Sequence, residues 1–249
     1  MAESSFGELI YDCLDGIVFK VRENGKVINK TVYLCVGLNK EGLKEVLGMW
    51  VGKNESAAFW MGVLTDLKAR GVEDILITVT DNLNGFTETI KSVFPTSTTQ
   101  ICVVHQIRNS CRYVVWKEKK EFTSDLKNIY NAPTKEAAKM ELENFEQKWG
   151  TKYPYAIRSW RNNWEELTVF FDFPVEIRKI IYTTNLIENL NGKIRKYTKN
   201  KLSFPNDDAL KKSVYLAITE IEKKWYQPIW NWALIFNQFI TIFKNRIQV

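Results

Sequence analysis

The sequence predicts an α/β fold, in which a sheet flanked by helices is followed by a purely helical region. Three β-branched and apolar runs, separated by turns, come first, within residues 9–52. Helical and extended segments then alternate to about residue 120, and from about residue 121 the hydrophobic spacing is helical only. This order predicts strand-strand-strand-helix-strand-helix-strand-helix, with further helices inserted before the last part of the domain.

The first three strands are expected to form a meander joined by two tight turns. Asn24-Gly25 between two apolar runs is a strong hairpin signal, because both residues tolerate positive φ. The expected strands and turns are, in order, Ile17–Arg22, Glu23–Gly25, Thr31–Val36, Asn39–Gly42 and Glu45–Val51.

A helix is expected after the meander. Asn54 or Ser56 offers the N-cap, and apolar residues follow at i, i+4 and i+8 from Phe59. Gly71 is expected to end this helix, since glycine adopts the left-handed conformation of a C-terminal cap without strain.

The run Asp74–Thr80 has no polar alternation, as is typical of a buried central strand. Asp81 lies at its C-terminal end, the place where ligands gather in open α/β sheets. We expect a helix over Thr87–Phe94, a strand over Thr98–Val104 and a helix over about Gln106–Lys119.

The remaining sequence predicts helices throughout. Pro133-Thr134 opens one helix and Gly150 closes it, Ile157, Trp160 and Trp164 mark another, and further helices are expected over about 183–196, 209–223 and 230–243. The absence of a low-complexity linker favours an insertion into the α/β domain. The predicted division is residues 1–120 as the first part of a catalytic core, 121–178 as an all-helical insertion, and 179–249 as the last part of the core.

Composition limits the class of protein. The chain has 249 residues, a net charge of +6 and a pI near 9.0, which favours a polyanionic partner. Its four cysteines form no CxxC pair and indicate reduced thiols, and neither a signal peptide nor a membrane span is evident, so a soluble cytoplasmic protein is expected. No P-loop, Rossmann glycine motif or GxSxG is present.

Three acids stand out, and each also has a local explanation. Asp15 lies in CLDGIVFKVR and competes with Asp12 for any metal role, and Asp81 is compatible with an Asx turn. Glu188 follows Asn185 at the spacing of a capping box. Its neighbours on the helix surface are Asn191, Gly192 and Arg195, away from the apolar face, which is expected to consist of Leu186, Leu190, Ile194 and Tyr197. Two strand-borne aspartates and a helix-borne glutamate, brought together, have the oxygen ligands to hold two divalent ions for phosphodiester chemistry.

A basic run follows Glu188. Residues 189–201 contain no acid but carry Lys193, Arg195, Lys196, Lys199 and Lys201. A carboxylate at the head of a cationic face suits a metal site beside a phosphate backbone, although a solvated charged face is the usual explanation of such a run.

Cys102 and His105 form a CxxH pair that contains the single histidine. Zinc would need four ligands, and no persuasive second pair completes the set. General-base catalysis is a further possibility, but packing or hydrogen bonding at a strand-to-helix junction is favoured. For Trp160 and Trp164, core packing is favoured over stacking on an unpaired base.

Several motifs together resemble the mutator-type transposases of bacterial insertion sequences, from about residue 10 to the C-terminus. The motifs are TDNLNGF, ICVVHQIRNS, APTKEAAKMELENFEQKWG, RSWRNNWEEL, IRKIIYTTNLIENLNGKIRKYTKN and FPNDDALKK. The resemblance implies an RNase H-like mixed sheet with a DDE triad and an all-helical insertion before the glutamate.

By motif position, Asp15, Asp81 and Glu188 match the triad, and Cys102 and His105 match the family's CxxH. The resemblance implies two Mg²⁺ ions, with Mn²⁺ able to substitute, held by the triad for DNA strand cleavage and strand transfer. Phosphates of the DNA backbone would then be positioned by Lys193, Arg195, Lys196 and Lys199. Transposon ends, target DNA and other copies of the chain are the expected partners, and the bacterial nucleoid is the expected place of action.

The chain also departs from the family pattern. Asn82 and Asn84 stand where the family usually has Gly and Lys, and only about nine residues precede the first expected catalytic strand. The latter leads us to expect a truncated form that lacks most of the N-terminal DNA-binding region. Two alternatives therefore stay open: a non-enzymatic transposase remnant that binds DNA or a partner, and an RNase H-like nuclease without strand transfer.

Overall fold

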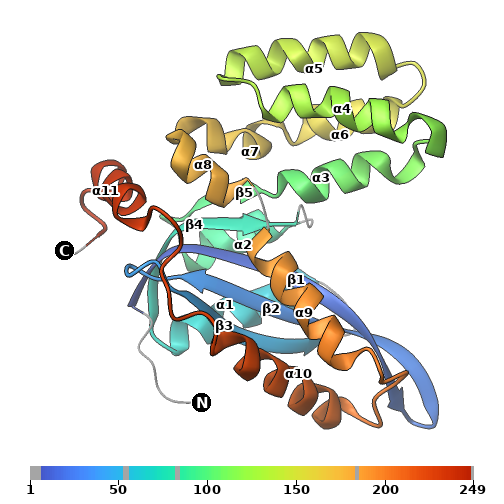
Figure 1. The fold of residues 1–249 in the computed structure, drawn as a ribbon, viewed down its shortest axis with the longest axis vertical. Helices are drawn as coiled ribbons and strands as arrows, with labels where there is room; N and C mark the ends of the chain where they lie inside the picture. Colours follow the sequence, from blue (N-terminus) through green and yellow to red (C-terminus); the bar gives the residue numbers. More distant parts are fainter. Residues whose placement is uncertain (1–6, 53–55, 82–84, 183–184, 248–249) are drawn as a thin grey trace. The chain divides into compact units, whose positions relative to one another are not determined.

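The computed structural model describes residues 7–52, 56–81, 85–182 and 185–247, and the side chains of residues 7, 8, 11, 12 and 185 are not described. The chain divides into two compact units (Figure 1). Unit 1 combines residues 1–98 with residues 184–249, and unit 2 consists of residues 99–183. These boundaries, after residues 98 and 183, differ from the predicted domain boundaries after residues 120 and 178. The predicted domain division stays a prediction.

The sheet is mixed, with the strand order β3-β2-β1-β4-β5. Its strands are β1 (Gly7–Glu23), β2 (Lys26–Leu38), β3 (Lys44–Gly52), β4 (Val72–Thr80) and β5 (Thr98–Ile101). β2 pairs antiparallel with both β1 and β3, while β4 runs parallel to β1. The boundary between the units falls after the first residue of β5. The predicted α/β class, a mixed sheet flanked by helices, is confirmed.

The predicted meander is confirmed, with longer strands than the sequence indicated. Asn24 and Gly25 have φ values of +50° and +77°, as a two-residue hairpin of the favoured primed type requires. At the second turn, Asn39 Oδ1 accepts the backbone N–H groups of Glu41 and Leu43, and Gly42 takes a φ of +76°.

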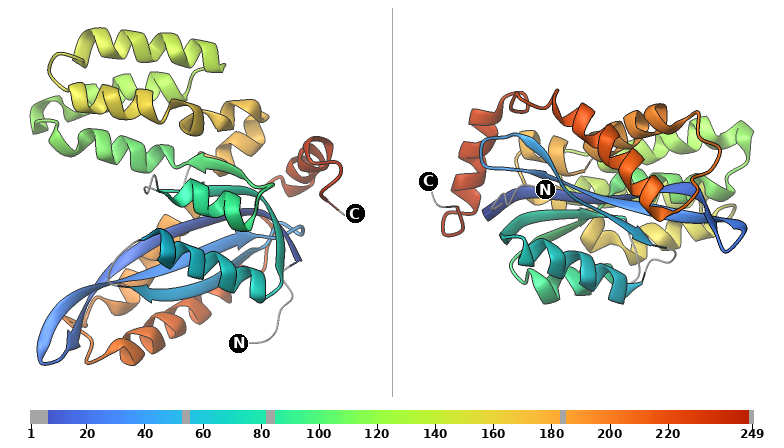
Figure 2. Two further views of the ribbon diagram at one scale, coloured as in Figure 1. Left: turned by 180° about the vertical axis from the view of Figure 1, so that it is seen from behind. Right: turned by 90° about the horizontal axis from the view of Figure 1, so that it is seen from below.

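Helices cover both faces of the sheet in unit 1 (Figure 2). On one face lie α1 (Ala57–Ala69) and α2 (Phe86–Val93), and on the other lie α9 (Asn185–Thr198) and α10 (Asp207–Glu222); α11 (Trp232–Ile242) follows near the C-terminus. Ser56 caps α1 as predicted, with its Oγ 3.1 Å from the Phe59 nitrogen. Gly71, at a φ of +93°, follows the end of α1, as predicted.

A buried aromatic cluster joins the sheet to α1 and α2. The Trp60 ring of α1 stacks on Phe86 of α2 at 4.3 Å and meets the Tyr33 ring of β2 edge-on at 5.1 Å. All three side chains are at most 3% exposed. Burial of such large apolar side chains is the main stabilising term for this layer.

Unit 2 is helical after β5. Its helices are α3 (Val103–Ser110), α4 (Lys119–Tyr130), α5 (Lys135–Trp149), α6 (Pro154–Asn162), α7 (Trp164–Leu167) and α8 (Val175–Ile181), with short 3-10 turns η1 (Cys111–Tyr113), η2 (Trp116–Glu118) and η3 (Val169–Asp172). Thr134 caps α5 and Gly150 follows it, as predicted. Trp160 and Trp164 are 1% and 9% exposed, which confirms core packing and excludes stacking of their buried rings on a base.

Two predicted boundaries in this region are wrong. The strand expected over residues 98–104 ends at Ile101, because Cys102 caps α3: its Sγ accepts the His105 N–H at 3.4 Å. The helix expected to run on to Lys119 stops at Ser110, where the chain turns through η1 and η2 and buries Val114 between them.

Candidate active site

Asp15 lies within β1, in the middle of the sheet. It is paired with Leu34 of β2, and its side chain is half-buried. The Gly16 N–H donates to Asp15 Oδ1 at 2.7 Å. A Cβ atom on Gly16 would lie 2.6 Å from the Thr31 side chain, so the close approach of β2 requires glycine directly after the aspartate.

The register of β1 and β4 brings Asp15 and Asp81 to the same level. Asp12 pairs with Thr78 and Cys13 with Val79, each separated by 66 positions. Asp15 and Asp81 are separated by the same number, and each lies two residues beyond the Cys13–Val79 pair. Parallel neighbouring strands lie about 4.8 Å apart and side chains alternate with a period of two. The two half-buried aspartates therefore lie at the same level, Asp15 within β1 and Asp81 directly after the last residue of β4.

Helix α9, which bears Glu188, is anchored at Asp15. α9 packs on β1 and β2 (Figure 1), and Asn191 Nδ2 donates to Asp15 Oδ2 at 2.6 Å. Glu188 precedes Asn191 by three residues, and side chains at this spacing are neighbours on a helix, with Cβ atoms about 5–6 Å apart. All three predicted acids consequently belong to unit 1, and the helix that bears the half-buried Glu188 is anchored at the carboxylate of Asp15.

The loop after α9 fixes the helix against β1. Phe204 forms an isolated bridge with Val21, its N–H donates to the Lys20 carbonyl at 2.8 Å, and its carbonyl accepts the Arg22 N–H at 2.8 Å. The Phe204 ring meets that of Phe19 edge-on at 5.8 Å. These contacts join the C-terminal part of β1 to the loop that follows α9. The C-terminal end of the helix that bears Glu188 is therefore held near β1 as well.

Asn191 is a site residue that sequence reasoning missed. The sequence suggested that its side chain points away from the apolar stripe of α9, but it is only 6% exposed. The stripe consists of Ile187, Leu190, Ile194 and Thr198. Tyr197, predicted to lie on it, is 56% exposed, so that prediction is wrong. The spacing could have indicated its burial, because Asn191 follows the buried Ile187 by four residues and residues four apart lie on the same face of a helix.

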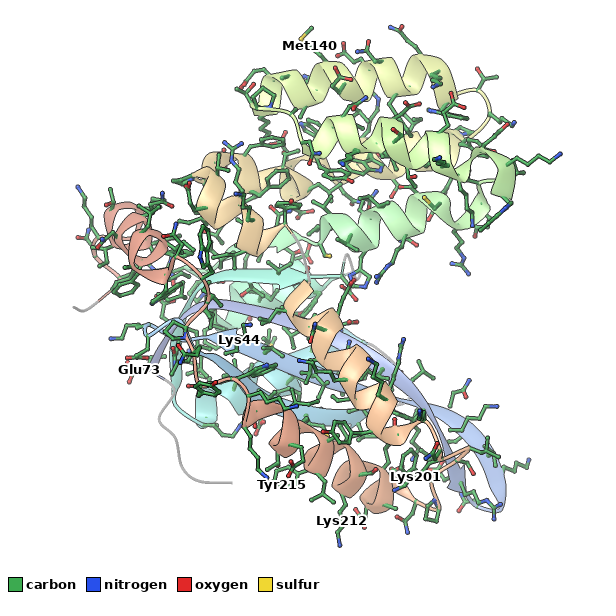
Figure 3. All side chains as sticks on the ribbon, in the orientation of Figure 1. Lys44, Glu73, Met140, Lys201, Lys212 and Tyr215 are labelled. Atoms are coloured by element: carbon green, nitrogen blue, oxygen red, sulfur yellow. The ribbon has the colours of Figure 1, made fainter. Side chains whose placement is uncertain are left out.

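Three of the four predicted DNA-binding cations lie on α9, and the fourth, Lys199, directly follows its last residue. Arg195, Lys196 and Lys199 are exposed, and Lys193 is half-buried. Lys44, at the start of β3 in the same unit (Figure 3), adds a cation that the sequence did not single out. Burial lowers the pKa of Lys44, and the positive charge of Lys193 lowers it further. Positive charge thus gathers where α9 meets the sheet.

The capping explanation of Glu188 involves Asn185, whose side chain lies outside the described residues. So do Asn82 and Asn84, the two departures from the family motif, and Thr183 and Thr184, the predicted start of α9. Asn185 is the first residue of α9 as described.

A family model described as "Transposase, Mutator family" matches residues 4–228. The chain belongs to this transposase family. It is 43% identical over 242 residues to a probable transposase for an insertion sequence element, ISRM3-like, of Sinorhizobium fredii, and equally to the transposase for insertion sequence element ISRM3 of Rhizobium meliloti. A probable transposase of Corynebacterium diphtheriae is 41% identical over 212 residues.

These matches cover 96%, 96% and 85% of this Mutator-family chain, but only 60%, 60% and 62% of the three relatives. The chain thus spans about three fifths of their length. Among solved structures, 58% of the chain aligns with 49% of a chain from a simian T-cell lymphotropic virus intasome in complex with PP2A regulatory subunit B56 gamma, at 14% identity and a TM-score of 0.31. A similarity of this size does not assign the fold.

The CxxH pair of this Mutator-family chain belongs to unit 2. Cys102 is fully buried and His105 is half-buried in the first turn of α3. The thiol acts as the N-cap of that helix, a hydrogen-bonding function of the kind that the sequence favoured. No described helix of the chain is both long enough and apolar enough to span a bilayer.

Proposed function

We propose that this chain is the catalytic portion of a DDE transposase with an RNase H-like core, in which Asp15, Asp81 and Glu188 form the triad. The observation that supports the proposal most directly is the hydrogen bond from Asn191 to Asp15. It holds the glutamate-bearing helix against the strand that carries the first aspartate. The parallel pairing of β1 and β4, which extends to Cys13 and Val79, supports a position of the second aspartate at the same level.

The donor set fits magnesium. Three carboxylates supply hard oxygen ligands, which Mg²⁺ prefers, and Asn191 adds a buried Oδ1 that accepts no hydrogen bond from the described residues. Asp15, Asp81 and Glu188 would hold two Mg²⁺ ions, or Mn²⁺ in their place. When bound, such ions activate the attacking oxygen and stabilise the leaving oxygen of a phosphodiester.

The protein's own residues position the DNA. Lys193, Arg195, Lys196 and Lys199 bind backbone phosphates beside the triad, which fixes the register of the strand without reading its sequence. The Gly16 N–H and the Asn191 amide hold the two oxygens of Asp15 in a fixed orientation. The helical unit 2 lies in the sequence between Asp81 and Glu188, as an insertion before the third catalytic acid would.

The substrate and assembly follow from this chemistry. The DNA is an insertion-sequence end and its target, and joining two ends to one target calls for more than one copy of the chain. The site of action is the bacterial nucleoid. Because the chain spans about three fifths of its relatives, recognition of specific ends belongs to the whole protein.

The test is an assay of labelled insertion-sequence ends with Mg²⁺ or Mn²⁺. Strand transfer supports the transposase, hydrolysis alone supports the RNase H-like nuclease, and DNA binding with neither activity supports the remnant. In an active chain, Asp81→Asn and Glu188→Gln are expected to reduce turnover to background, because each replaces a charged ligand by a neutral one.

Asp208→Asn is the matched control. Asp208 is also an acid in the first turn of a helix of unit 1, but it is exposed on α10. Its replacement is expected to leave turnover unchanged, with DNA affinity and circular dichroism unaltered in all three variants. Unfolding of Glu188→Gln would favour the capping role of Glu188, and full activity of either triad variant would refute the triad.

A further inference from the structure

Unit 2 presents an aromatic surface that the catalytic proposal does not use. Trp116 is 85% exposed, and Tyr113 and Val115 beside it are 63% and 52% exposed. Tyr155, from the start of α6, is 49% exposed. The tryptophans of α5, α6 and α7 are at most 9% exposed, so unit 2 buries these three and displays Trp116. We call residues 111–120 together with Tyr155 the η-turn surface.

The η-turn surface has a rigid base. The Tyr113 and Tyr155 rings pack edge-to-face with centroids 5.5 Å apart. The Val115 N–H donates to the Tyr153 hydroxyl at 3.4 Å, and that hydroxyl donates to Glu118 Oε2 at 2.5 Å. Val114 is buried beneath, at 4% exposure. The Tyr113–Tyr155 ring pair and the backbone on either side of Trp116 are therefore held in place, which lowers the entropy cost of binding a partner.

The acids of this region are already neutralised. Glu118 pairs with Lys152, and the hydrogen bonds from Lys152 and Tyr153 hold the pKa of Glu118 below its usual range. Glu121, the next acid along the chain, pairs with Lys148 at 2.7 Å. Both cations come from outside residues 111–120, from α5 and from the turn that follows it.

The cations of the η-turn surface are not neutralised in this way. Among the described residues no carboxylate forms an ion pair with the four basic side chains Arg112, Lys117, Lys119 and Lys120. Arg112 is exposed, and its guanidinium lies 5.6 Å from the centre of the Tyr113 ring. The surface thus combines exposed aromatic rings with excess positive charge.

We propose that the η-turn surface binds unpaired DNA, with phosphates on its four cations and a base stacked on Trp116. This inference rests on the proposed function for its setting, a chain that works on DNA ends. Interleaved aromatic and basic side chains are the general means of binding single strands, since every base has a face on which an aromatic ring stacks. Paired bases inside a duplex offer no such face, so Trp116 selects unpaired DNA.

Charge argues against another copy of the chain as the occupant. In a symmetric contact the same surface patch meets itself, and here it would bring two sets of unpaired cations together. Like charges brought together across an interface oppose association. A nucleic acid strand supplies the complementary charge along with the stacking bases.

The experiment measures binding of the full chain to a fluorescein-labelled single-stranded 20-mer and to the matching duplex, by anisotropy in EDTA. Without metal there is no cleavage, so binding is separated from turnover. Trp116→Ala is expected to weaken single-strand binding about tenfold, equal to about 1.4 kcal/mol, and to change duplex binding less than about twofold. Trp116→Phe is expected to retain most of the affinity, because it keeps an aromatic face.

Trp230→Ala is the matched control, because Trp230 is 88% exposed but belongs to unit 1. It is expected to leave single-strand affinity within about twofold. Equal losses for the two alanine variants, equal losses on single strand and duplex, or no loss at all would overturn the proposal. Unchanged circular dichroism and melting temperature exclude unfolding as the cause, and Trp116 is exposed enough for both to persist.

The outcome is independent of the catalytic test. If the chain shows no strand transfer but Trp116→Ala lowers its single-strand affinity, the proposed role of the η-turn surface is supported and the proposed function is refuted. If the chain is an active transposase and Trp116→Ala leaves its single-strand affinity unchanged, the proposed function is supported and the proposed role of the η-turn surface is refuted.

Discussion

Both oxygens of the Asp15 carboxylate accept a hydrogen bond, one from its neighbour in the strand and one from a helix 176 positions away. The Gly16 N–H holds Oδ1, and the Asn191 amide holds Oδ2. An amide donor at 2.6 Å from a carboxylate oxygen is short and stabilises the charged form. In the proposed site, Asn191 is thus a positioning residue. It holds the carboxylate of Asp15 and lies on the same helix as Glu188.

Asn191→Ala removes this donor and leaves Asp15 less constrained. The Mg²⁺ concentration for half-maximal turnover is expected to rise about 10- to 100-fold, the usual effect of losing a partner of a metal ligand. The free energy of unfolding is expected to fall by about 1–3 kcal/mol, since a half-buried carboxylate loses one of its two hydrogen-bond donors. Magnesium titration of strand cleavage and urea unfolding measure the two effects.

Thr198→Ala serves as the comparison. Thr198 is buried on the same face of α9, but among the described residues its Oγ1 donates only to carbonyls of its own helix, those of Ile194 and Arg195. A loss of stability without a change in the magnesium requirement is expected. If both variants shift that requirement equally, Asn191 has only a structural role.

At the scale of elements, the C-terminal segment is tied to the start of β4. Arg246, beyond the end of α11, donates to both carboxylate oxygens of Asp74 at 2.7 and 2.8 Å and to the carbonyls of Ile75 and Thr96. Burial raises the pKa of Asp74, but the hydrogen bonds and charge of Arg246 outweigh it, so the pKa lies below its usual value. This bidentate pair anchors residues that follow the last helix.

Arg246→Gln is expected to reduce the free energy of unfolding at pH 7 by about 1–2 kcal/mol, because a paired carboxylate loses its charged donor. The folded-state pKa of Asp74 is depressed, so the stabilisation is present above the unfolded pKa of about 3.9 and is lost as the pH falls through the folded value. The difference between the two proteins should therefore shrink below about pH 4.

Lys244→Gln provides the control, since Lys244 is exposed two residues earlier. Urea unfolding between pH 7 and pH 3 is expected to show no pH-dependent difference for this variant. A gap between Arg246→Gln and the unaltered chain that stays constant down to pH 3 would contradict the linkage to Asp74.

At the scale of the whole molecule, the two units have separate cores. Leu64 of α1 and Leu126 of α4 are both fully buried, one in each unit. Replacing either by alanine leaves a cavity that costs about 2–5 kcal/mol. Because each core is a compact unit, the loss should accelerate opening mainly in the unit that carries it.

Hydrogen exchange measures this directly. Leu126→Ala is expected to speed amide exchange within residues 99–183 and Leu64→Ala within residues 56–81 and neighbouring strands, with little crossover. Each variant is thus the control for the other. Equal acceleration in both units would show that the chain unfolds as one cooperative unit.

Local chemistry predicted most of the fold. The Asn24-Gly25 hairpin, the Ser56 and Thr134 caps and the end of the helix at Gly71 each depend on a few adjacent residues, so they were found without tertiary information. The errors have two kinds of cause. Around residues 102–119 the cause is local, the cap at Cys102 and the turns η1 and η2, whereas in α9 it is packing on a distant segment. Helix α9 is rotated by about one residue from the predicted stripe, which buries Asn191 and exposes Tyr197.

The sequence by itself determined the family and the order of most elements, and it singled out the three acids that we propose as the triad, because motifs and hydrophobic periodicity are carried by neighbouring residues. The tertiary structure alone decided that Asn191 meets Asp15, that the β1–β4 register sets Asp15 level with Asp81, and that Trp116, not Trp160, is the exposed tryptophan of unit 2. The reason is physical. Strand register and helix rotation follow from packing between segments far apart in the chain, and a local sequence pattern does not specify which side of a helix or strand is buried in that packing.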